Sequence, residues 1–145
     1  MTKKVIYPPK DYQAPFCRFI FRYGQLEGIK TDKTLNTAMG RGFTGTLNNI
    51  IGKSRSILIT KTRKEMEKVN LHNCIGEILY YTCSDTKSIS LLRHLRNSIA
   101  HGNIHQDGKY FIIKDYYNSK NKKLSAYGKI QIEKIREIVN EYTKV

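Results

Sequence analysis

The most informative part of this 145-residue sequence is the stretch 88–102, SISLLRHLRNSIAHG. Apolar side chains recur in it at helical spacing, so it is predicted to form an amphipathic helix that begins near Ser88 or Ser90. Gly102 supplies the left-handed residue that commonly follows a last helical turn. This arrangement places His101 at the C-cap of the predicted helix.

Two residues near the end of this helix have complementary chemistry. The Arg96 guanidinium keeps its charge and offers a planar set of donors to phosphate, whereas the His101 imidazole can gain or lose a proton near neutral pH. About 7.5 Å of helical rise separates them, roughly the span of one phosphate and its flanking oxygens. The negative end of the helix favours a protonated His101 and the neighbouring arginine opposes it, and the sequence leaves open which effect is larger. The sequence predicts that both groups lie on one small surface, where such a pair can support phosphodiester cleavage without a metal ion.

The run LLRHLRNSIAHG (residues 91–102) resembles the signature of the HEPN superfamily, in which an arginine precedes a histidine by a short spacer at a helix end. The resemblance implies an all-α fold and, as in many members, metal-independent endoribonuclease activity of the toxin–antitoxin, phage-defence or RNA-processing type. It also implies that Arg96 and His101 are catalytic and that Asn97 is an auxiliary polar residue. Two copies of the motif would face each other across a homodimer. The resemblance is best from about residue 71 onward.

The reaction expected from this motif is internal transesterification of RNA. A base removes the proton of a ribose 2′-hydroxyl, the oxygen attacks the adjacent phosphorus, and an acid protonates the departing 5′-oxygen. His101 is the candidate for one proton transfer and Arg96 for stabilising the phosphate charge. Asn97 could orient His101 or a phosphate oxygen. Because one histidine suits one transfer, a second motif from a dimer partner would complete the composite site.

Four further polar residues near the motif are candidates for RNA binding, and each can instead be an ordinary solvated residue: Arg93, His94, Asn103 and His105. A purely structural interpretation also applies to the motif itself. Arg96 could form an ion pair with a carboxylate of a neighbouring helix, and His101 could cap its own helix by bonding carbonyl groups.

The charge of the chain favours an anionic partner such as RNA. Lys and Arg number 26 against 12 Asp and Glu, a formal net charge of +14 that is spread along the sequence rather than confined to a tail. Organisms with lysine-rich proteomes also make basic proteins without such a partner. The alternatives to an enzyme are therefore a non-catalytic HEPN-like module that binds RNA or a nucleotide, or a protein-interaction subunit such as the partner of an antitoxin.

Length and composition fit one HEPN-like domain over residues 1–145 in the cytoplasm. No apolar run approaches a membrane span and no secretory signal is visible, so neither a membrane nor an export route is expected. Cys17, Cys74 and Cys83 show no disulfide or zinc spacing and are expected to be buried thiols. Since the carboxylate nearest the motif is Asp107, no metal and no other cofactor are expected.

The remaining segments are predicted to complete an antiparallel helical bundle. Further helices are expected over residues 14–26, within 46–69, over 71–83 and over 130–142. Residues 28–45 suit a loop because threonine and glycine cluster there. Residues 109–117 and 123–129 are rich in β-formers and predict a small hairpin inserted before the C-terminal helix. The predicted fold class is all-α.

Two short matches to phosphate-binding loops are rejected. Residues 40–45 have GxGxxG spacing, but no strand precedes them and no βαβ unit surrounds them. Residues 52–54, Gly-Lys-Ser, end like a nucleotide-binding loop, yet Leu47 stands where its first glycine belongs. A dinucleotide or nucleoside triphosphate site is therefore not expected.

Overall fold

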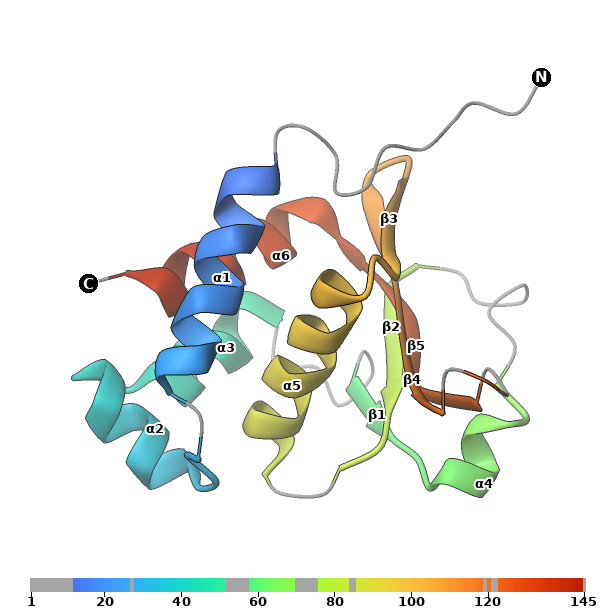
Figure 1. Cartoon of the computed structure of the whole chain (residues 1–145), viewed down its shortest axis with the longest axis horizontal. Coiled ribbons are helices and arrows are strands. Elements are labelled where there is room, and N and C mark those ends of the chain that lie inside the picture. Colours follow the sequence, from blue (N-terminus) through green and yellow to red (C-terminus); the bar gives the residue numbers. More distant parts are fainter. Residues whose placement is uncertain are drawn as a thin grey trace.

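The structure is a computed structural model that describes residues 12–26, 28–51, 58–69, 76–83, 86–118, 120 and 123–144. Its elements in chain order are α1 (Gln13–Gln25), α2 (Asp32–Met39), α3 (Phe43–Ile51), β1 (Leu58–Thr60), α4 (Arg63–Met66), β2 (Ile78–Tyr81), α5 (Lys87–Ala100), β3 (Ile104–Asp107), β4 (Tyr110–Asn118), β5 (Lys123–Gln131) and α6 (Ile132–Thr143) (Figure 1). None of the described helices is long and apolar enough to cross a membrane.

The strands form one mixed sheet in the order β1-β2-β5-β4-β3. β1 and β2 are parallel neighbours, and the other three pairs are antiparallel. The protein therefore has an α/β fold, and the predicted all-α bundle is wrong. Strands do form where the hairpin was expected, as β4 and β5, but both lie inside the sheet with a further strand on each side.

Two short strands explain why the sequence pattern misleads. β1 and β2 lie in the segments 46–69 and 71–83 that were predicted to be helical, and residues 71–75 lie outside the described residues. The strands have only three and four residues, and so short an apolar run does not distinguish a strand from part of a helix. Pairing decides their conformation, since Leu79 of β2 lies between Leu58 of β1 and Gly128 of β5.

The predicted loop at residues 28–45 contains α2 and the beginning of α3. Thr31 starts α2, because its side-chain oxygen accepts a hydrogen bond of 3.1 Å from the Thr34 N–H. α3 follows after a short turn and buries three side chains at helical spacing, Phe43, Leu47 and Ile51. The rejected match at residues 40–45 covers this turn and the start of α3, and residues 52–54 lie outside the described residues.

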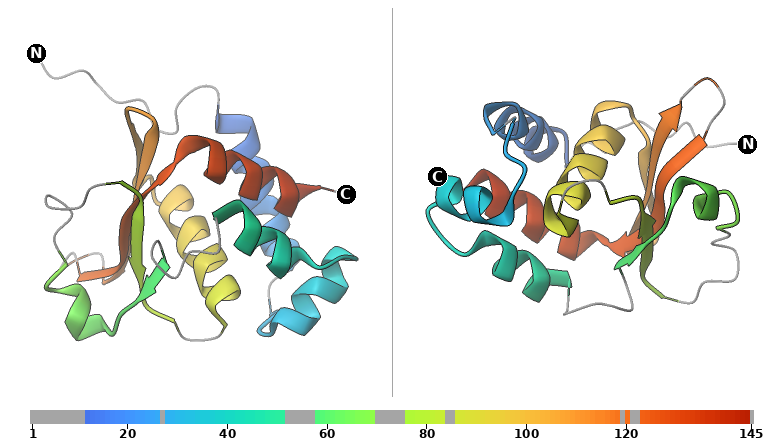
Figure 2. Two further views of the ribbon diagram at one scale, coloured as in Figure 1. Left: turned by 180° about the vertical axis from the view of Figure 1, so that it is seen from behind. Right: turned by 90° about the horizontal axis from the view of Figure 1, so that it is seen from below.

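α5 lies between the sheet and other helices. Figures 1 and 2 show the sheet nearly edge-on, with α1, α3, α5 and α6 on one side and α4 on the other. α5 contacts β2 and β4 on one side and α1 on the other. Nine of its 14 residues are buried as a result, including three serines and a histidine. Polar groups in such a position need hydrogen-bond partners within the protein.

Gly128 marks a close approach between two strands of the sheet. It lies in β5, opposite Leu79 of β2 and Ile113 of β4. A Cβ atom at this position would lie 2.2 Å from the Ile78 carbonyl oxygen and 2.5 Å from the Leu79 Cα. Both are backbone atoms, so any side chain here would force the strands apart.

We expect Gly128→Ala to lower the free energy of unfolding by about 1–3 kcal/mol or more, the range for forcing extra atoms into a packed interior. Gly45→Ala is the matched control, because a Cβ at this helical position meets nothing within 4 Å. The control should be neutral or stabilising by up to about 1 kcal/mol. Urea denaturation followed by circular dichroism measures both changes, and an undiminished stability of Gly128→Ala would contradict the close approach.

Candidate functional site

α5 starts earlier than its sequence predicts. Thr86 is the N-cap, since its hydroxyl oxygen accepts a hydrogen bond of 3.2 Å from the Ile89 N–H and its hydroxyl donates one of 2.5 Å to the Asp32 carboxylate. Ser88 and Ser90, the predicted starting residues, are buried inside the helix. The cap therefore ties the beginning of α5 to α2.

The end of α5 agrees with the prediction. The Asn103 N–H donates to the Ser98 carbonyl at 2.8 Å and the Gly102 N–H to the Ile99 carbonyl at 3.3 Å, the two bonds of a Schellman turn. Gly102 has φ of 70°, a conformation that glycine adopts without steric cost. His101 is the C-cap residue and is exposed.

A chain of hydrogen bonds connects Arg96 to the interior. The Arg96 guanidinium donates to Asn97 Oδ1 at 3.1 Å, and Asn97 Nδ2 donates to Asp115 Oδ2 at 3.3 Å. The same Asp115 oxygen lies 2.7 Å from His94 Nδ1, and His94 Nε2 lies 2.7 Å from the Thr82 carbonyl oxygen. Because arginine only donates and the Asp115 oxygen accepts, the orientation of the Asn97 amide follows from its two neighbours.

The His94–Asp115 pair contains a shared proton. A carbonyl oxygen only accepts, so His94 Nε2 carries a hydrogen directed at Thr82. A second hydrogen must lie between His94 Nδ1 and Asp115, because two lone pairs at 2.7 Å would repel. The pair is therefore either imidazolium with carboxylate or imidazole with carboxylic acid. Both forms have zero net charge, which suits side chains that are only 2% and 6% exposed.

Arg96 and His101 face different surroundings. Arg96 is half-buried, and its guanidinium carbon lies 6.0 Å from the centre of the Tyr23 ring. Among the described residues, no carboxylate pairs with Arg96 and no group hydrogen-bonds the His101 imidazole. At about 100° per residue, the two positions lie about 140° apart around the helix axis. Each group is therefore accessible to a ligand, but from a different side of α5 rather than from the one small surface that the sequence predicts.

The other predicted RNA-binding residues are not equivalent. Arg93 is half-buried beside a cavity, whereas His94 is buried and is not the solvated residue that the sequence allows. Asn103 is half-buried, and its backbone joins the strand ladder through a bond of 3.0 Å from the Lys114 N–H to its carbonyl. Arg93 therefore combines a permanent charge with a position at a cavity.

Burial also shifts two titratable groups in this region. It lowers the pKa of His105 in β3 below the usual 6.5, and the nearby Lys114 charge adds to this effect. His105 is therefore uncharged at neutral pH and adds no positive charge toward RNA. Burial raises the pKa of the Tyr81 hydroxyl to about 12, and its ring lies edge-on to His94 at 5.9 Å between ring centres.

A cavity of about 440 Å³, called here the His94 cavity, opens where β1 and β2 end. Residues 61–63, 82–83 and 115–117 line it together with three side chains of α5, Arg93, His94 and Asn97. The pairing of β4 with β5 is irregular on both sides of Tyr116. Such bulges re-aim side chains, which explains why consecutive residues of β4 border one cavity.

Asp115 was not among the predicted site residues, although the sequence contains a signal for it. Phe111 and Ile113 alternate along the predicted strand, and Asp115 is the next residue in this buried row. A carboxylate in a buried row requires a polar partner, and His94 lies among apolar residues in the predicted helix. Lys61 and Arg63 had no comparable signal, because only the fold brings them to the cavity.

The described residues contain no cluster of three or more His, Cys, Asp or Glu side chains that could hold a metal ion. Cys17 and Cys83 are exposed, which corrects the prediction that they are buried, and Cys74 lies outside the described residues.

A family model described as HEPN pEK499 p136 matches residues 22–145. The chain belongs to this HEPN family. The match begins within α1 and therefore extends well before residue 71. No curated protein and no solved structure matches the chain. HEPN membership supports a nuclease, RNA-related or toxin-like function at the level of the family.

In this HEPN protein, Asp115→Ala should lower the free energy of unfolding by about 3–5 kcal/mol, because it leaves the buried His94 imidazole without its hydrogen-bond partner. Asp115→Asn is the matched control. Its amide can donate to Nδ1 of a neutral His94, so the loss should be only about 1–2 kcal/mol. Urea denaturation gives both values, and equal losses would contradict the shared proton.

Proposed function

We propose that the protein is a metal-independent endoribonuclease that cleaves RNA by attack of a ribose 2′-hydroxyl on the adjacent phosphorus. The observation that carries this proposal is the position of Arg96, Asn97 and His101 in the last turn and cap of α5. No carboxylate of the described chain neutralises Arg96, and His101 is exposed at a helix end. The HEPN match over residues 22–145 supports the same chemistry at the family level.

Each motif residue has a distinct role in this reaction. One nitrogen of Arg96 is bound by Asn97 Oδ1, and its other N–H groups would bind the scissile phosphate and stabilise its growing charge. His101 would transfer one proton, either from the 2′-hydroxyl or to the departing 5′-oxygen. The products are a 2′,3′-cyclic phosphate and a 5′-hydroxyl. DNA has no 2′-hydroxyl and would not be cleaved.

A homodimer would complete the acid–base pair. The reaction requires two proton transfers, whereas the motif offers one histidine per chain. Arg96 and His101 also project to different sides of α5, so a substrate bound between two facing motifs could meet the histidines of both protomers and the arginine of one. This composite site is the arrangement that we propose.

The biological role that fits such an enzyme is a toxin or phage-defence ribonuclease controlled by an antitoxin. The toxin-like character of the family supports this role. The alternative function is a non-catalytic module that binds RNA or a nucleotide, or that contacts another protein. The basic His94 cavity favours RNA binding whether or not His101 transfers a proton.

We expect the purified protein to cleave structured RNA in excess EDTA. Arg96→Ala and His101→Ala should each reduce the cleavage rate by about 10²–10⁴-fold, the range for losing an acid–base or charge-stabilising group. Arg136→Ala removes an exposed arginine of α6 and should leave the rate unchanged. Gel analysis of the products, with circular dichroism to verify folding, separates the enzyme from the binding module. Cleavage retained in both motif variants, or lost in EDTA, would overturn the proposal.

The composite site makes a separate prediction. Unchanged protein that exchanges subunits with an excess of His101→Ala protein should lose most of its cleavage rate per unchanged chain. Each mixed dimer then lacks one of the two histidines of the acid–base pair. Sedimentation analysis establishes whether the protein is dimeric. A rate per unchanged chain that stays constant, in a dimer that exchanges subunits, would show that each chain contains a whole site.

A further inference from the structure

The His94 cavity has an excess of positive charge in its lining. Lys61 reaches it from the segment after β1, Arg63 from the start of α4, and Arg93 from α5. Asp115 is the one carboxylate among the described lining residues, and its pair with His94 has zero net charge. The cavity is therefore suited to an anion of several oxygens, such as a phosphate.

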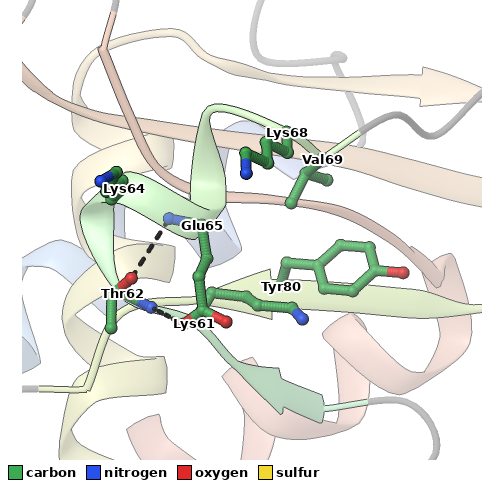
Figure 3. Close-up of a pocket in the computed structure, with 7 residues that line it drawn as sticks. All are labelled: Lys61, Thr62, Lys64, Glu65, Lys68, Val69 and Tyr80. Atoms are coloured by element: carbon green, nitrogen blue, oxygen red, sulfur yellow. Dashed lines mark hydrogen bonds between the residues drawn. The ribbon is translucent and has the colours of Figure 1, made fainter.

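A second basic cavity, called here the α4 cavity, adjoins the first and shares Lys61 and Thr62 with it. It has a volume of about 520 Å³, and Figure 3 shows its lining around α4 and Tyr80. Its cationic side chains are Lys61, Lys64 and Lys68. Glu65 is the acidic side chain in this lining, and it accepts a hydrogen bond of 2.9 Å from the Thr62 N–H. That bond lowers the pKa of Glu65 and directs its carboxylate to the backbone.

Aromatic rings accompany these cations. The Arg63 guanidinium carbon lies 4.4 Å from the centre of the Tyr117 ring, which is 39% exposed. Lys61 Nζ lies 5.8 Å from the centre of the Tyr80 ring. Rings that can stack on bases, beside cations that can bind phosphates, are typical of surfaces that bind single-stranded nucleic acid. This combination favours RNA over an acidic protein, for which the rings offer no specific contact.

We propose that the His94 cavity binds a phosphate group of RNA and that the strand continues across the α4 cavity. Asn97 links this path to the motif, because it lines the His94 cavity and also accepts the hydrogen bond from Arg96. The phosphate bound in the cavity is then a neighbour of the phosphate that is cleaved. This inference rests on the proposed function for the identity of the ligand, but it requires only binding.

The test measures binding of a short fluorescein-labelled 2′-O-methyl RNA, which has no free 2′-hydroxyl and so resists cleavage. Lys61→Ala and Arg63→Ala should each weaken binding severalfold in fluorescence anisotropy. Each should also reduce the slope of log K against log salt by about 0.7, the value for one lost phosphate contact on a single strand. Lys33→Ala on α2 and Arg136→Ala on α6 remove exposed cations elsewhere and should bind like the unchanged protein.

Competition separates the possible ligands. Displacement of the RNA by adenosine monophosphate would show that the cavity takes a terminal phosphate, and failure to displace it would indicate an internal phosphodiester, so both results agree with the proposal. Polyglutamate that competes as well as unlabelled RNA would assign the surface to an acidic protein and overturn it. Unchanged affinity and salt slope in Lys61→Ala and Arg63→Ala would also overturn it.

The binding test is independent of catalysis. Weaker RNA binding by the two cavity variants, in a protein that does not cleave RNA in EDTA, would reject the nuclease and retain the phosphate site. If the protein cleaves RNA but its RNA binding does not change in Lys61→Ala and Arg63→Ala, the phosphate site is rejected and the nuclease is retained.

Discussion

The position of α5 depends on how its buried polar side chains are satisfied. An unpaired polar group in the interior costs about 1–3 kcal/mol, so a helix that buries a histidine and several serines must place them opposite partners. His94 meets Asp115 of β4 and the Thr82 carbonyl after β2, and Ser98 meets the Lys114 carbonyl at 2.6 Å. The apolar residues of the same helix are also buried, but their contacts do not require partners in specific directions. These polar contacts therefore set the register of α5 on the sheet.

The same contacts also orient a side chain near the protein surface. Asp115 also binds Asn97, and Asn97 binds Arg96, so the orientation of a half-buried guanidinium follows from a pair in the interior. At the other end of the motif, the backbone bonds of the Schellman turn present His101 to solvent and lead the chain into β3. In the candidate site, side-chain hydrogen bonds therefore hold Arg96, whereas His101 is exposed on the turn that ends α5.

Several acidic residues of this basic protein serve the fold. Glu77 pairs with Lys134 and accepts a bond from the Gln131 N–H, and Asp32 accepts the bond from the N-cap of α5. Asp115 is buried and hydrogen-bonds His94 and Asn97. Carboxylates used in this way do not neutralise Lys61 and Arg63, which explains how the His94 cavity keeps its positive character.

Local patterns were sufficient for the helices α1, α5 and α6, for the strands β4 and β5, and for the cap at His101, because each depends on residues close together in the sequence. They were also sufficient for the motif and the HEPN resemblance. They were insufficient for β1 and β2, whose short apolar runs become strands only by pairing with each other and with β5. The partner of His94 is 21 residues away and the cations after β1 are farther still. The sequence by itself therefore determined which groups are candidates for the chemistry, and only the tertiary structure decided which of them meet, because those contacts join segments that no local interaction brings together.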